Sequence, residues 1–258
     1  FNVAVTNHAS CFNYAQGGAR VTNPVGPGNK YLGGDNATLG QLTVPVVTQI
    51  QNHLSKLPQG KFAGTELVTV MAGGNDVFIN VATYSATVTA APSQATAAAT
   101  AAVTAMATAG AELAGYVKTK LKANGAKYIV VVNLPDVAST PAFSSSPAKP
   151  LVTSMVTAFN SSLQAGLDGS GVLLVDAYAL SQDLVANKQY YGLTNVTSPA
   201  CILDDPAKNP LASSLVCTTA TALSGTDYYL FADTVHPTPY GNKVNADFIV
   251  KKIDRMIW

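Results

Sequence analysis

The chain has 258 residues, of which 48% are hydrophobic and 11% are charged, and its formal net charge is +1. This length suits a single α/β domain over residues 1–258 with a large core. The balanced charge, with no basic run, argues against nucleic acid as a partner, and no apolar run predicts a transmembrane segment. Sparse charge and many small polar residues favour a secreted protein.

Apolar patterns typical of strands and of helices alternate along the chain. The short run Cys11–Ala15 predicts a strand that ends at the paired glycines Gly17 and Gly18. Further strands are predicted over residues 66–72, 127–133 and 171–176. Helices are predicted over residues 41–57, 92–124, 151–167, 179–186 and 241–258, and residues 189–229 are expected to be irregular. The alternation predicts a parallel sheet with helices on both faces, whose ligands bind at the carboxyl ends of the strands.

A short loop before the last predicted helix carries Asp233 and His236. A carboxylate three residues before a histidine can accept the imidazole Nδ1 proton and leave Nε2 free as a base. The alternative is an ordinary surface turn, because Asp and Pro both favour turns.

The chain contains three cysteines, Cys11, Cys201 and Cys217. The last two enclose 15 residues of a segment rich in Pro, Ser, Thr and Asp. We favour a disulfide between them over two reduced thiols, and a chain-entropy estimate gives it about 3 kcal/mol of stabilisation. We expect its reduction to lower the melting temperature without affecting any chemistry. Cys11 has no assigned partner.

Three motifs together resemble sequence blocks of the GDSL-type (SGNH) esterases and lipases. Asn13–Ala19 (NYAQGGA) resembles the second block of that family, Gly73–Asp76 (GGND) the third, and Asp233–Pro237 (DTVHP) the fifth. The resemblance runs from about Cys11 to the C-terminus. Asn133–Asp136 (NLPD) and the late cysteine pair are similar to the secreted bacterial phospholipase/lecithinase-like branch.

The resemblance implies a three-layer αβα sandwich with a mainly parallel, flavodoxin-like sheet of strand order 2-1-3-4-5. It also implies that His236 is the general base and Asp233 its orienting partner. The Gly18 backbone N–H and the Asn75 side-chain amide would form the oxyanion hole, which needs donors already directed at the developing charge. No metal and no cofactor are implied.

The nucleophile block of the family, Gly-Asp-Ser-Leu, does not occur in this sequence. Gly33–Asn36 has Asn where the serine is needed, and Ser170 precedes a predicted strand instead of following one. We therefore expect an N-terminal segment outside this chain to carry the serine. It would be bound in the folded protein as the first strand, between the Cys11 strand and residues 66–72.

The expected function is that of a serine ester hydrolase, an esterase or lipase acting on a small-molecule or lipid ester through a Ser-His-Asp triad. We expect a secreted or periplasmic protein. The alternative is a non-catalytic relative that binds an ester, a lipid or a glycan in the same cleft. Metal-dependent hydrolysis is disfavoured because His8, His53 and His236 do not have the spacing of metal ligands.

Overall fold

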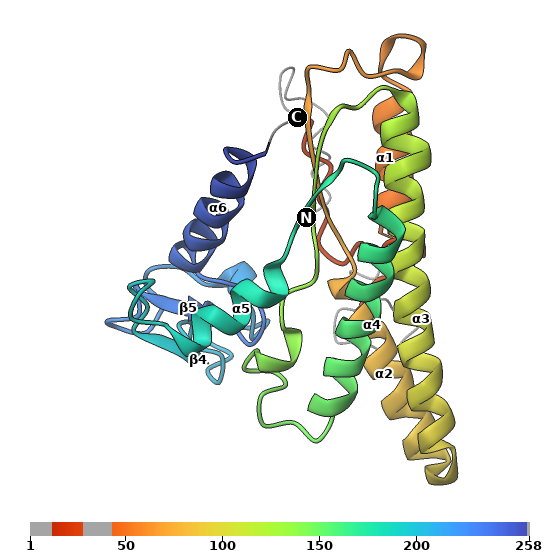
Figure 1. Cartoon of the computed structure of the whole chain (residues 1–258). Coiled ribbons are helices and arrows are strands. Elements are labelled where there is room, and N and C mark those ends of the chain that lie inside the picture. Colours follow the sequence, from red (N-terminus) through yellow and green to blue (C-terminus); the bar gives the residue numbers. More distant parts are fainter. Residues whose placement is uncertain (1–11, 28–42, 257–258) are drawn as a thin grey trace. The chain divides into compact units, whose positions relative to one another are not determined.

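The computed structural model describes residues 12–27 and 43–256, which fall into two compact units (Figure 1). The described residues of unit 1 are 12–27, 43–134 and 154–174, and those of unit 2 are 135–153 and 175–256. Cys11, His8 and Gly33–Asn36 lie outside the described residues. A single domain over residues 1–258 stays a prediction.

A three-stranded sheet consists of β1 (Leu67–Met71), β2 (Tyr128–Val132) and β3 (Leu173–Val175), in the order β1-β2-β3. The first two run parallel, with Leu67 opposite Tyr128 and Met71 opposite Val132. These strands were predicted from their apolar runs, and their order is that of the last three strands of a flavodoxin-like sheet. Four of the five β2 residues are buried, as expected of an inner strand, whereas β1 is largely exposed.

Four helices contribute to unit 1: α1 (Val46–Leu54), α2 (Gly74–Ala90), α3 (Ala95–Tyr116) and most of α4 (Lys149–Leu167). Figure 1 shows α2, α3 and α4 side by side, and α3 packs along α2. Helices α3 and α4 approach closely at two glycines. A Cβ on Gly110 would lie 2.3 Å from the Phe159 carbonyl oxygen, and one on Gly166 would lie 2.5 Å from the Ala114 Cβ. The small residues of α3 therefore allow a close helix–helix contact.

The helical stretch Pro92–Asn124 is long and apolar enough to cross a membrane by length and composition alone, which the sequence analysis did not anticipate. It consists of the turn Pro92–Gln94, α3, a π-helical turn Val117–Leu121 and a 3₁₀ turn Lys122–Asn124. Core helices of soluble proteins meet the same criterion. Met106, Leu113 and Ala114 of α3 are completely buried, but only 33% of the most apolar 18-residue window is buried.

The N-terminal half differs from the sequence predictions in two places. The strand predicted over residues 11–15 is not seen, because residues 12–15 do not pair as a strand within the described part of the chain. Phe12 is exposed there. The Asn13 side chain accepts the Ala15 N–H, and this local hydrogen bond competes with strand pairing. Helix α2 was not predicted. It is rich in Val, Ile and Thr, which have low helix propensity.

Unit 2 contains α5 (Ala177–Ala186), β4 (Asn195–Pro199), β5 (Tyr229–Phe231) and α6 (Pro239–Ile253). Strands β4 and β5 form a small parallel sheet in a segment that was expected to be irregular. Both are short, and Pro199 and Asn195 are unfavourable strand residues, so the sequence signal is weak. Buried Leu180, Leu184, Leu193, Val196, Leu230 and Phe231 form the core of the unit.

Short 3₁₀ turns complete the described structure. They are Pro58–Gly60, Val137–Ser139 and Ser214–Val216 (η7).

Candidate active site

The loop that follows β5 holds Asp233 and His236 in direct contact. The His236 Nδ1 lies 2.8 Å from Asp233 Oδ2 and 3.0 Å from Oδ1. Asp233 Oδ1 also accepts the backbone N–H groups of Val235 (2.8 Å) and His236 (2.7 Å). The Ala232 N–H donates to the His236 carbonyl at 2.8 Å and closes the turn. Asp233 and His236, which were singled out from the sequence, are therefore held together by hydrogen bonds within one loop.

The two side chains of this pair differ greatly in solvent exposure. The Asp233 side chain is 4% exposed, whereas the His236 side chain is 64% exposed. Burial by itself would raise the pKa of Asp233, but hydrogen bonds from His236 and Ser214 hold that pKa well below its usual range. The hydrogen bond to Asp233 raises the pKa of His236 above 6.5, and burial partly opposes that rise. Because Nδ1 is directed at a fixed carboxylate, Nε2 is the ring nitrogen left for other chemistry.

Ser214 supplies a backbone donor to the carboxylate that the sequence did not reveal. Its N–H donates to Asp233 Oδ2 at 2.8 Å. Ser214 begins η7, and the Cys201–Cys217 disulfide lies just after that turn. The predicted disulfide is thus confirmed, and it lies beside the Asp–His pair. No pattern in the sequence linked Ser214 to Asp233, which lies 19 residues further along the chain.

The other predicted pair, Gly18 and Asn75, lies in unit 1. Gly18 lies within a turn closed by the Ala19 N–H, which donates to the Gln16 carbonyl, and its φ of +80° is one that glycine adopts without strain. Asn75 lies in the first turn of α2 and donates from Nδ2 to the Ala19 carbonyl at 2.8 Å. The structure thus ties the asparagine to the residue directly after Gly18.

Gly18 and Asn75 each have an N–H group that binds no acceptor among the described residues. Within residues 12–27 and 43–256, no acceptor is bound by the Gly18 N–H, and Asn75 Nδ2 uses only one of its two hydrogens. The Asn75 amide orientation follows from its partner, since a carbonyl can only accept. Two unused donors on neighbouring segments are suited to bind a negatively charged oxygen.

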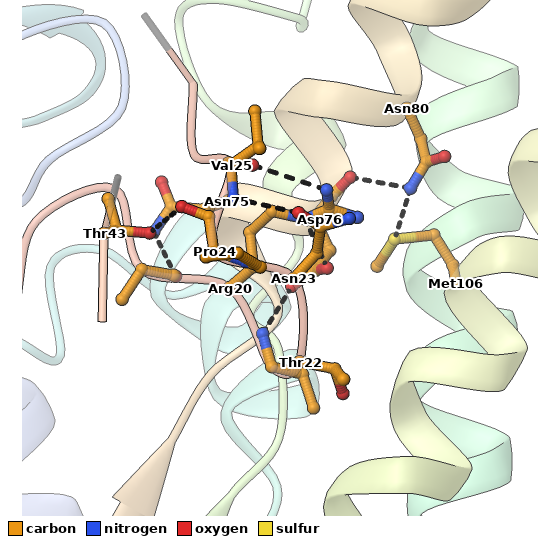
Figure 2. Close-up of polar contacts among 12 residues, drawn as sticks. Arg20, Thr22, Asn23, Pro24, Val25, Thr43, Asn75, Asp76, Asn80 and Met106 are labelled. Atoms are coloured by element: carbon orange, nitrogen blue, oxygen red, sulfur yellow. Dashed lines mark hydrogen bonds and ion pairs between the residues drawn. The ribbon is translucent and has the colours of Figure 1, made fainter. Parts of the chain in front are cut away.

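An ion pair holds the segment after Gly18 against the start of α2, as Figure 2 shows. Arg20 Nε donates to Asp76 Oδ1 at 2.8 Å, and the Val21 N–H donates to Asp76 Oδ2 at 3.1 Å. Burial raises the pKa of Asp76, which is 3% exposed, while Arg20 and the Val21 N–H counteract that rise. Arg20 was not among the predicted site residues, although it directly follows the Gly-Gly-Ala motif.

Comparisons with known proteins agree with this picture. The family model of GDSL-like lipases/acylhydrolases matches residues 2–249. An uncharacterized protein from the trpE–trpG intergenic region of Pseudomonas putida is 31% identical over 148 residues, 54% of this chain and 23% of that protein. A GDSL esterase/lipase of Arabidopsis thaliana is 29% identical over 96 residues, 36% of this chain and 25% of that protein.

The matches thus span about a quarter of the length of either relative. The family match itself covers almost all of the chain, and the α/β architecture with parallel strands fits it. The chain therefore belongs to the GDSL-like lipase/acylhydrolase family.

Proposed function

We propose that this protein is a serine ester hydrolase, an esterase or lipase that cleaves carboxylic esters through a Ser-His-Asp triad. The observation that carries the proposal is the Asp233–His236 pair: a buried carboxylate bound to Nδ1 of a histidine whose ring is exposed. This arrangement prepares Nε2 to accept a proton from a hydroxyl group. A disulfide is compatible with an extracellular protein, and we propose secretion or a periplasmic location.

In the proposed reaction, a serine hydroxyl attacks the ester carbonyl carbon and its proton passes to His236 Nε2. The Gly18 N–H and the Asn75 amide receive the oxyanion of the tetrahedral intermediate. His236 then returns the proton to the departing alkoxide, which leaves as an alcohol. Water attacks the acyl-enzyme by the same route and releases the carboxylic acid.

We further propose that the serine lies on a bound segment outside these 258 residues. Among the described residues, β1 pairs with β2 along one edge only. Leu67 and Met71 of β1 are 52% and 56% exposed, although strands of parallel sheets are usually buried on both faces. A further parallel strand beside β1 would satisfy the free edge and bring the residues at its carboxyl end to the carboxyl end of β1.

The alternative is a non-catalytic relative that binds an ester, lipid or glycan. Such a protein has no need to bury a carboxylate and bind it with several donors in order to orient an exposed histidine. Burying a charge is costly unless it is well satisfied, so the Asp233 environment favours an enzyme.

Covalent labelling with a fluorophosphonate probe tests the proposal on the protein purified from its natural source. We expect one adduct, on a serine in a peptide outside residues 1–258, and its loss in the His236→Ala variant. A protein that stays unlabelled would support the binding alternative. An adduct on a serine of this chain would keep the hydrolase and refute the separate segment.

A further inference from the structure

The Cys201–Cys217 disulfide joins two segments that both contact the chain around Asp233. On one side of the bridge, the Cys201 N–H donates to the Ala232 carbonyl at 2.9 Å. On the other side, the Cys217 N–H donates to the Ser214 carbonyl at 3.2 Å, and the Ser214 N–H donates to Asp233 Oδ2. The bridge therefore closes a ring of contacts that runs through the predicted catalytic carboxylate.

Few other contacts hold η7 in place. The Asn209 side chain accepts the Ser213 N–H at 3.0 Å and donates to the Ser213 carbonyl at 3.1 Å, and Asn209 is only 2% exposed. Leu215, in contrast, is 55% exposed and gives the turn no apolar anchor. The position of the Ser214 amide thus depends on the disulfide at one end of the turn and on Asn209 at the other.

This amide decides how firmly Asp233 presents its oxygens. Oδ1 already has two backbone donors from its own turn, but among the described residues Oδ2 has only His236 and Ser214 as partners. Without Ser214, the carboxylate could rotate about its Cβ–Cγ bond and still keep one bond to the histidine. Hydrogen bonds to an ionised carboxylate are among the stronger ones in proteins, so the loss is not small.

We propose that the Cys201–Cys217 disulfide is a positioning element for the Asp–His pair, acting through the Ser214 backbone amide. Its meaning for catalysis depends on the proposed hydrolase function. This proposal revises the expectation from the sequence that reduction would lower only the melting temperature. Reduction of the bridge should also release Asp233 Oδ2 and leave the His236 ring less well oriented.

The test is made on this 258-residue chain by proton NMR, comparing it with the Cys201→Ala/Cys217→Ala double variant. We expect the low-field resonance of the His236 Nδ1–H to be sharp with the bridge and broadened or lost without it. Leu184→Ala serves as a matched control, because it destabilises the core of the same unit without touching the loop. The proposal is overturned if the resonance survives in the double variant, or if Leu184→Ala loses it to the same extent.

A second variant covers the case in which the double variant does not fold. Ser214→Pro keeps the bridge but removes the backbone donor to Asp233 Oδ2, so it should broaden the same resonance. An unchanged resonance in this variant would refute the proposal.

Kinetics on the unlabelled, nucleophile-bearing protein give an independent reading. There the double variant should lose roughly 10- to 100-fold in kcat with an unchanged KM. A protein that shows the NMR effect but is not labelled by fluorophosphonate would refute the hydrolase function while keeping the positioning role.

Discussion

At the scale of single residues, the charge of Asp233 sets the pH at which His236 can act. The histidine must be neutral to accept a proton, and its hydrogen bond to Asp233 raises its pKa above 6.5. Activity should therefore rise with pH through that raised pKa. In Asp233→Asn the negative charge is gone, so the acid limb of the kcat/KM profile should move to lower pH, and the plateau should fall by roughly 10²–10⁴-fold.

The same pKa shift predicts how stability depends on pH. A histidine whose pKa is raised by folding contributes stability that is fully present below its unfolded value of 6.5 and is lost as pH rises through the folded value. Thermal unfolding across this range should show such a decline in the unsubstituted protein and not in Asp233→Asn. If the acid limb of kcat/KM and the pH dependence of stability are each the same in Asp233→Asn as in the unsubstituted protein, Asp233 does not raise the pKa of His236.

Asn75 has one hydrogen bond in the structure and one proposed role in catalysis, which makes its substitution informative. One Nδ2 hydrogen holds the Ala19 carbonyl, and the second is free to bind an oxyanion. Asn75→Ala should therefore lose about 2.7–4 kcal/mol of transition-state stabilisation, seen as a lower kcat with little change in KM. Asn80→Ala is the matched control, since Asn80 also donates from α2 but only to the Asp76 carbonyl and Met106. If only KM rises in Asn75→Ala, Asn75 is a binding residue.

Most of the residues that the sequence singled out were identified by the functional groups of their side chains; the exception is Gly18, whose proposed donor is its backbone N–H. Asp233, His236, Asn75 and the two bridged cysteines could be identified because each needs a specific functional group at a specific spacing. Ser214 donates its backbone N–H to Asp233 Oδ2, and its side chain also forms a hydrogen bond that lowers the pKa of Asp233. Such a donor is known only once the fold brings it to the carboxylate.

At the scale of elements, the buried Arg20–Asp76 pair joins the Gly18 segment to α2. Replacing Arg20 with Met would leave the buried Asp76 carboxylate with the backbone N–H of Val21 as its remaining partner. We expect this to lower the free energy of unfolding by about 3–5 kcal/mol at neutral pH. Adding Asp76→Asn to this variant should recover part of the loss, because no buried charge is then left. Urea unfolding measures both effects.

The pH dependence of that loss has a definite sign. Asp76 already has a raised pKa, and without Arg20 it should rise further. A carboxyl with a raised folded pKa binds more protons in the folded than in the unfolded state, so it destabilises increasingly as pH rises from its unfolded value toward the folded one. The deficit of Arg20→Met should therefore shrink on going from pH 7 to pH 5. An equal deficit at both pH values would mean that the substitution acts through packing.

Some helices and strands are easier to predict from their sequences than others. Continuous apolar runs predicted β1, β2 and β3, and the 3.6-residue stripes predicted α1, α3 and α4, because burial on a sheet or a helix face dictates those patterns. Helix α2 is stabilised by its contacts with α3 more than by its own propensity, and β4 by its pairing with β5. Each depends on a partner element outside its own residues, which the pattern within the element does not record.

At the scale of the whole molecule, the edge of β1 that no residue of 12–27 or 43–256 pairs with bears on the function. In a strand, successive N–H groups point to alternate sides, so β2 can protect only one alternate set of the β1 amides. In the 258-residue chain alone, hydrogen exchange should therefore show alternating protection along Leu67–Met71. Binding of a further strand at the free edge would protect the second set as well.

This alternation gives a test that does not depend on catalytic activity. Protein labelled by fluorophosphonate contains the nucleophile, so we expect uniform protection along β1 in that material and the alternating pattern in the chain by itself. Val68 and Val70 differ from their neighbours in the side to which their N–H groups point, and Ile129 and Val130 of the inner strand β2 provide protected references. An alternating pattern that persists in labelled protein would place the serine elsewhere than on a strand beside β1.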